Sequence, residues 1–99
     1  MKIEFDKTWK IATLYLDDPR VNPASGSFRV MRAGSDEYKV LPNISFSGHF
    51  ALAEEFWDRV KLAGDTAMKI ADILNGAGTF ENAVFAIEQR WPDEVLNND

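Results

Sequence analysis

The start of the chain alternates between apolar and polar side chains, which is the pattern of a half-buried β-strand. Charged residues or threonine separate the apolar odd-numbered positions Ile3, Phe5, Trp9 and Ile11. A single strand over residues 2–16 would be unusually long. We therefore expect two strands with a tight turn near the Asp6-Lys7 step.

Residues 17–27, DDPRVNPASGS, contain two prolines, a glycine and several polar side chains, so they cannot continue a β-ladder. We expect a long exposed connection there. Strand character resumes in SFRVMRA at 27–33 and in EYKVLP at 37–42, with the residues of a hairpin loop between them. ISFS at 44–47 is a candidate for one more short strand.

From Gly48 onward the apolar period lengthens from two to between three and four, which predicts helix. The apolar positions are Phe50, Ala53, Trp57, Val60, Gly64, Ala67, Ala71 and Leu74. The Gly64-Asp65 step either ends one helix and begins another, or places a glycine where a second element packs closely. The sequence leaves both alternatives open.

The segment NGAG at 75–78 predicts a firm helix stop, and Thr79 is a suitable N-cap for a further helix. The apolar side of that helix is formed by Phe80, Val84, Ile87 and Trp91. Pro92 should end it. We expect the tail DEVLNND to add one turn and then fray.

Strands that precede helices, without the alternation that builds a parallel sheet, are typical of the α+β class. We predict one domain over residues 1–99, with a sheet half at 1–47 and a helical half at 48–99. Its architecture is a three- to four-stranded antiparallel sheet with two to three C-terminal helices packed on one face. The three tryptophans, Trp9, Trp57 and Trp91, are expected to converge on one core.

The composition excludes most metal and thiol chemistry. The chain has no cysteine and one histidine, so zinc fingers, iron–sulfur clusters and thiol nucleophiles are ruled out. With 45% hydrophobic residues it can bury a core, and no apolar run approaches the ~20 residues that span a bilayer. The N-terminus lacks the apolar stretch of a secretory signal, so we expect a cytoplasmic protein without a membrane segment.

The segment SGHFALAEEFWDRV at 47–60 places the histidine near acidic residues, which raises the question of a metal or acid-base site. On a helix the neighbours of His49 are Leu52 and Ala53, whereas Glu54 and Glu55 fall on other faces. The spacing does not fit a shared metal site, and no serine lies in a catalytic motif. We predict that the protein is not an enzyme and uses no metal or cofactor.

Charge is distributed unequally between the two halves. Residues 1–48 carry a net charge of +1, whereas residues 49–99 carry −6. On a continuous helix Glu54, Asp58, Asp65 and Asp72 would form an acidic stripe, with Glu55 in the first turn, where the helix dipole favours anions. Such a stripe is either an ordinary solvated face or a surface that docks on a basic partner protein.

We predict the docking function. The chain has the features of a small acidic protein-binding module, comparable to the inhibitors that phages and other mobile elements use against host CRISPR or restriction machinery. In the strongest form its carboxylates would imitate nucleic-acid phosphates. Asp17, Asp18 and Arg20 in the long loop are secondary binding candidates. The sequence leaves the partner's identity and homodimer formation open.

The alternative function uses the sheet half. A wet sheet face with basic residues, joined by Tyr15 or Met31, would suit single-stranded nucleic acid. The basic residues in the polar phase of the strands are Lys2, Lys10, Arg29 and Lys39. The acidic balance of the whole chain argues against this function, and such residues also keep a sheet surface soluble.

Overall fold

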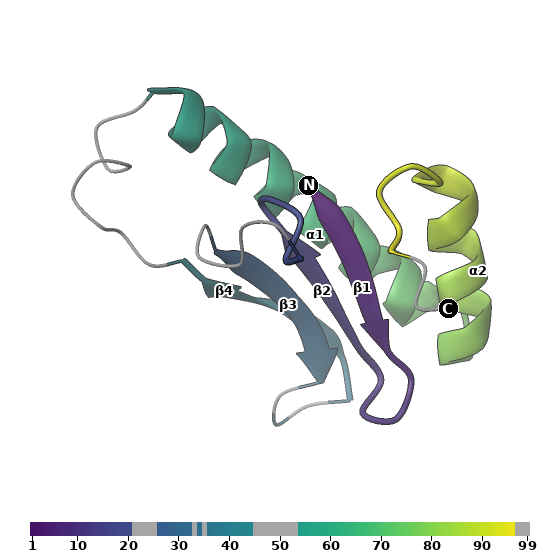
Figure 1. Ribbon diagram of the computed structural model, residues 1–99. Coiled ribbons are helices and arrows are strands. Elements are labelled where there is room, and N and C mark those ends of the chain that lie inside the picture. The colour runs from purple at the N-terminus through teal and green to yellow at the C-terminus, as the bar shows by residue number, and fades with distance from the viewer. Residues whose placement is uncertain (21–25, 33, 35, 45–53, 97–99) are drawn as a thin grey trace.

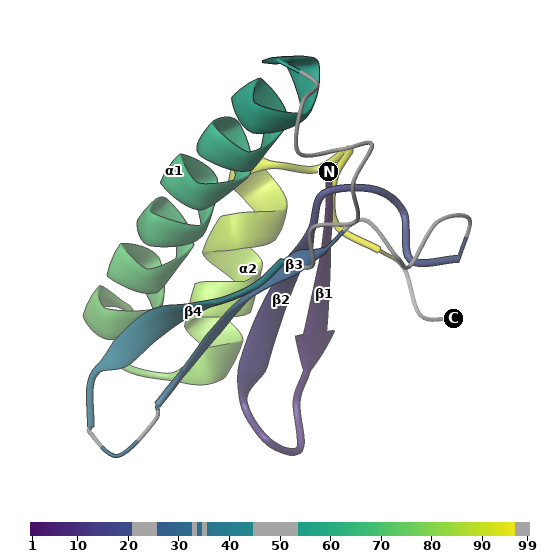
Figure 2. The ribbon, with the colours of Figure 1, turned by 90° about the vertical axis from the view of Figure 1, so that its left-hand side faces the viewer.

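The part of the chain that the structure, a computed structural model, describes is an α+β fold with one sheet and two helices (Figure 1). The structure describes residues 1–20, 26–32, 34, 36–44 and 54–96. The elements are β1 (Lys2–Asp6), β2 (Ile11–Tyr15), β3 (Ser27–Arg32), β4 (Tyr38–Asn43), α1 (Glu54–Gly76) and α2 (Phe80–Arg90). The strands form an antiparallel meander in the order β1-β2-β3-β4. Both helices cover the same sheet face, which confirms the predicted α+β class (Figure 2).

The predicted turn between the first two strands is present, and it changes which positions of the second strand are buried. Residues 7–10 form the turn, in which Asp6 Oδ1 accepts hydrogen bonds from the backbone N–H groups of Thr8 and Trp9, each at 3.0 Å. Phe5 pairs with Ala12, so the buried side moves from odd positions in β1 to even positions in β2. Ile11 therefore faces away from the helices, and its predicted place in the core was wrong.

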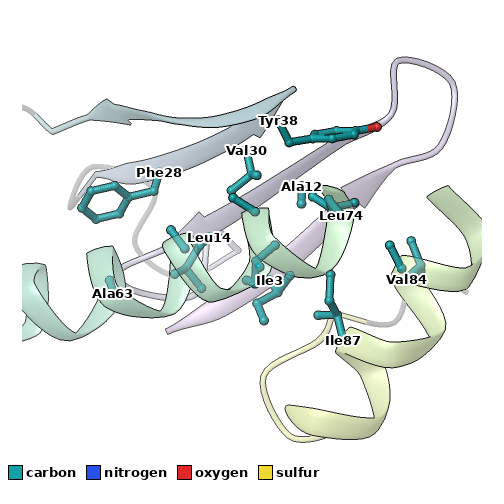
Figure 3. Packing of buried hydrophobic residues seen from close by; sticks show 14 of the residues in the cluster. Ile3, Ala12, Leu14, Phe28, Val30, Tyr38, Ala63, Leu74, Val84 and Ile87 are labelled. Carbon is teal, nitrogen blue, oxygen red and sulfur yellow. The ribbon is translucent and has the colours of Figure 1, made fainter. Parts of the chain in front are cut away.

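The core lies between the sheet and the two helices (Figure 3). Its largest fully buried side chains are Phe56, Ile3, Leu14, Ile70, Ile87 and Val30. Helix α1 packs over β2, β3 and β4, and α2 packs beside α1. The Phe80 ring of α2 meets the Phe5 ring of β1 edge to face, with 6.2 Å between ring centroids. Each fully buried aliphatic side chain contributes roughly 1.5–3 kcal/mol, so these residues dominate folding.

The three tryptophans do not converge on this core, contrary to the prediction. Trp9 lies in the β1-β2 turn and is 75% exposed, and Trp57 is 44% exposed on α1. Trp91 is partly buried against the core, with the Arg90 guanidinium 4.8 Å from the centre of its ring. The prediction failed for Trp9 because this residue continues the alternating pattern of the strand in sequence but lies in the turn in the structure.

Helix α1 runs without a break through Gly64, which decides between the two alternatives at that glycine. The ring of Phe28 lies below Gly64, 3.6 Å from where a Cβ atom would stand. The predicted stop is confirmed, since α1 ends at Gly76 and Thr79 caps α2 by accepting from the Asn82 N–H at 3.1 Å. Pro92 follows directly after α2 and the Trp91 cap.

The two edges of the sheet are closed by different groups. Beyond α2 the chain returns to β1, where the N–H of Ile3 donates to the Glu94 carbonyl and the N–H of Leu96 donates to the Ile3 carbonyl, both at 2.8 Å. The tail adds one turn at residues 92–94, as predicted, but the expected fraying after it was wrong for Val95 and Leu96, which pair with β1. At the β4 edge, the Asn75 amide accepts from the Tyr38 N–H at 2.7 Å and donates to its carbonyl at 3.1 Å.

Pro42 closes the other end of the β4 edge. Because groups on a strand alternate in direction, Tyr38, Val40 and Pro42 face away from β3, and proline offers no N–H to a further strand. Ile44 lies outside β4, and the rest of the predicted ISFS strand, like His49 and Phe50, lies outside the described residues.

Candidate functional site

The predicted acidic stripe lies on one exposed line of α1. Glu54, Asp58, Asp65 and Asp72 are all exposed, and the helix that carries them is continuous. Steps of four and seven residues at about 100° per residue bring the four carboxylates within about 40° around the axis. The stripe points away from the sheet, because the opposite side of α1 carries the buried residues.

Two lysines and two large apolar side chains border this stripe. Lys61 and Lys69 are exposed and lie about 40° to either side of Asp65. Leu62 is 58% exposed and Met68 is 62% exposed, about 60° to either side. We call these eight residues the α1 outer face: Glu54, Asp58, Lys61, Leu62, Asp65, Met68, Lys69 and Asp72.

Glu55, the fifth acidic residue predicted for the site, lies beside the stripe rather than on it. It is exposed in the first turn of α1, about 80° around the helix from Asp65. Its position near the helix N-terminus already has a structural explanation, because the positive end of the helix dipole stabilises carboxylates.

The secondary candidates in the long loop are engaged with local partners. Arg20 forms a two-pronged ion pair with Asp18, with its Nε 3.0 Å from Oδ1 and its Nη2 2.7 Å from Oδ2. The Arg20 hydrogen bonds lower the pKa of the Asp18 carboxyl to about 2. Asp17 Oδ1 lies 3.5 Å from the Arg59 Nη1 of α1. The Asp18–Arg20 pair is thus formed within the loop, and Asp17 connects the loop to α1.

The sheet face opposite the helices carries both signs of charge. Lys2, Arg29 and Lys39 lie on it as predicted, but so do Glu4 and Asp6, by the strand register. Lys10 lies in the β1-β2 turn and does not belong to this face. Carboxylates on β1 therefore interrupt the basic residues that were predicted for this face.

A polar hollow of about 360 Å³ lies on that open face. Within it the Tyr15 hydroxyl donates to Glu4 Oε1 at 3.2 Å. Partial burial raises the pKa of the Tyr15 hydroxyl, and the neighbouring Glu4 carboxylate raises it further. The hydrogen bond leaves the Glu4 carboxylate engaged rather than directed at a ligand.

A further exposed surface escaped the sequence prediction. Phe85 of α2 is 65% exposed, and Trp9 in the β1-β2 turn is 75% exposed. The beginning of α2 and the β1-β2 turn lie at the same end of the molecule (Figure 1). Phe85 could have been found, because it falls outside the apolar stripe of α2. Trp9 could not, because its alternating context resembled that of a buried strand residue.

Among the described residues, no group of three or more histidine or acidic side chains is placed to hold a metal ion. In the same part of the chain, neither helix has the length and apolar character needed to cross a membrane. Comparisons with protein family models, curated proteins and solved structures find no match for this chain. The function is therefore inferred from the surfaces of the molecule.

Proposed function

We propose that this protein is a non-enzymatic protein-binding module and that it binds through the α1 outer face. The observation that carries the proposal is the alignment of four exposed carboxylates on one rigid helix, bordered by two exposed apolar side chains. A face used only for solubility needs the charges but gains nothing from exposed Leu62 and Met68.

The two kinds of side chain would act at different stages of binding. Carboxylates attract a basic surface over about 8–10 Å at moderate ionic strength, which speeds the encounter. Leu62 and Met68 would then exclude water at the contact, and methionine adapts its shape to an irregular partner. The charges should govern the association rate, and the apolar side chains should govern the dissociation rate.

The proposed partner is a protein with a basic surface, and a host protein that handles nucleic acid is of this kind. Inhibition of such a protein remains the specific role that we propose for the module. The stripe extends about 27 Å at 1.5 Å per residue. Duplex DNA carries a charge about every 1.7 Å, so the spacing supports ordinary charge-assisted docking more than imitation of a phosphate backbone.

The test begins with capture of binding proteins from the native host's lysate by the wild-type chain, followed by purification of the captured partner. Two variants with equal charge change are then compared: Asp58→Asn with Asp65→Asn on the stripe, and Asp36→Asn with Asp93→Asn elsewhere. All four positions are exposed. We expect the stripe pair to slow association about tenfold at low salt and the control pair to leave it unchanged.

A third variant, Leu62→Ala with Met68→Ala, should accelerate dissociation and leave the association rate near that of the wild type. Equal association rates for the stripe pair and the control pair at low and high salt would reduce the stripe to a solvated helix face. Salt-sensitive binding of single-stranded DNA or RNA by the wild type, abolished by Arg29→Gln with Lys39→Gln, would instead favour the alternative function on the open sheet face.

A further inference from the structure

The end of the molecule near the β1-β2 turn contains a small apolar hollow between two elements that are far apart in sequence. The turn and the first turn of α2 lie at the same end in both views (Figure 1, Figure 2). The hollow measures about 210 Å³. Its lining is formed by Lys7, Phe80, Glu81, Val84, Phe85 and Glu88.

The hollow has the size for one side chain rather than for a small-molecule ligand, since ligand pockets usually measure about 300–1,000 Å³. Its floor is apolar, because Phe80 and Val84 are buried core residues with one side turned toward it. Phe85 adds an exposed ring at the border. The carboxylates of Glu81 and Glu88 and the ammonium group of Lys7 also line it, which leaves one negative charge in excess. An aromatic side chain with a single cation beside it would therefore match.

The chain itself carries such a pair, beside the hollow. Trp9 is 75% exposed, and the backbone N–H groups of Thr8 and Trp9 donate hydrogen bonds to Asp6 Oδ1, which fix the turn that presents it. Lys10 follows at once, in a left-handed conformation with φ of 57°. The turn thus offers an indole and an ammonium group to solvent.

We propose that Trp9 of a second copy of this chain occupies the hollow, with Lys10 of that copy beside Glu81 or Glu88, and that the contact is made reciprocally. In a two-fold symmetric dimer the same surface of each copy must fit that of the other. This surface does so in principle, because each copy carries both the turn with Trp9 and, beside it, the hollow that would receive Trp9 of the other copy. Sheet-edge pairing is a less favourable route to a dimer here, because the tail already pairs with Ile3 of β1, and Asn75 and Pro42 obstruct both ends of the β4 edge.

The surface involved is small, so the dimer is a transient one. This inference goes beyond the proposed function and does not depend on it, because it uses the β1-β2 turn and α2 instead of the α1 outer face. Loss of the dimer would leave partner binding on α1 untouched.

Sedimentation velocity over about 1 μM to 1 mM protein tests the proposal, since weak interfaces dissociate in this range. We expect a concentration-dependent dimer. Trp9→Ala should weaken association about tenfold or more, as removal of a central aromatic anchor does, and Phe85→Ser should weaken it as well. The matched control is Trp57→Ala, another partly exposed tryptophan, which should leave association unchanged.

Exchange of the charges gives a sharper test. Lys10→Glu alone should dissociate the dimer, because two carboxylates then meet in each contact, and Glu88→Lys alone should do so by opposing ammonium groups. A mixture of the two variants should recover a heterodimer, since the carboxylate introduced in one chain then faces the ammonium group introduced in the other, and the second contact keeps its native pair. Circular dichroism melting of each variant shows that it is folded.

A chain that stays monomeric over the whole range would overturn the proposal, and so would a dimer that ignores both Trp9→Ala and Phe85→Ser. A cyclic peptide of residues 6–11 serves as the probe for another occupant. If it shifts the NMR signals of Val84 and Phe85 while the full chain remains a monomer, the hollow receives an aromatic and basic segment of a different protein, and the second-copy assignment is wrong.

Discussion

The inner and outer faces of α1 are built from the same helix but are constrained in different ways. On the inner face, contact with the sheet dictates nearly every residue: Phe56, Ala63, Ala67, Ile70 and Leu74 are buried. On the outer face Leu62 and Met68 are more than half exposed. Residues of the outer face can therefore change without cost to folding, which makes that face available for binding.

Small residues in the middle of the inner face bring α1 close to the sheet. Ala63 and Gly64 are adjacent and Ala67 lies one turn later, and the Phe28 ring of β3 lies under Gly64. The larger Phe56 and Leu74 pack near the two ends. Packing against the sheet thus limits the size of the side chains on the inner face, whereas it does not limit the size of those on the outer face.

The adjacent residues Phe56 and Trp57 give the largest expected contrast on α1, between a residue of the inner face and one at the border of the outer face. Phe56 is 2% exposed, and Phe56→Ala should lower the free energy of unfolding by about 3–5 kcal/mol, through lost burial and the cavity left behind. Trp57 is 44% exposed, and Trp57→Ala should cost about 1–2 kcal/mol despite the larger ring. Urea denaturation with an unchanged m-value measures both. Equal losses would mean that Trp57 belongs to the core.

Much of the fold could be predicted from apolar periodicity, because packing imposes it. The helix boundaries near Gly76 and Thr79 depend on local chemistry that the sequence displays. The errors arose where tertiary geometry decides. A turn over residues 7–10 shifted the buried phase of β2, and pairing of Val95 with Ile3 ordered a tail that has no periodicity of its own.

The candidate site was predictable to a similar degree. The seven-residue spacing of Asp58, Asp65 and Asp72 predicted the acidic stripe for a continuous helix. Continuity through Gly64 itself came from the structure, because the sequence left it open. The hollow beside Phe85 could not be predicted, because it needs α2 to lie next to the β1-β2 turn. Contacts between elements that are distant in sequence leave no local signal.

Asn75 marks the boundary between the two faces, and its substitution should have an intermediate effect. Its side chain makes two hydrogen bonds to the Tyr38 backbone, and each such bond contributes about 0.5–1.5 kcal/mol. Asn75→Ala should therefore destabilise the protein by about 1–2 kcal/mol and speed amide hydrogen exchange at Tyr38.

Asn75→Asp is the matched control, because it keeps an acceptor for the Tyr38 N–H but loses the donor to the carbonyl. It should cost less than the alanine variant, and the Tyr38 amide should remain protected. Identical stability in all three proteins would show that water replaces the asparagine without loss, and that the β4 edge is closed by Pro42 alone.

Substitution of Gly64 has the smallest expected effect on stability. The direction of that effect shows whether the inner face of α1 merely tolerates a glycine at this position or requires one. An added Cβ would stand 3.6 and 3.7 Å from two atoms of the Phe28 ring, which are ordinary van der Waals distances. Gly64→Ala should therefore stabilise the protein by about 0.5–1 kcal/mol, by restricting the unfolded chain inside a helix that is already continuous. Gly78→Ala is the opposite control, since φ of 83° at that glycine disfavours any side chain and alanine should destabilise there. Thermal melts of both variants provide the comparison. If Gly64→Ala proves destabilising, α1 lies closer to Phe28 than these distances indicate, and the glycine is required by packing rather than tolerated by it.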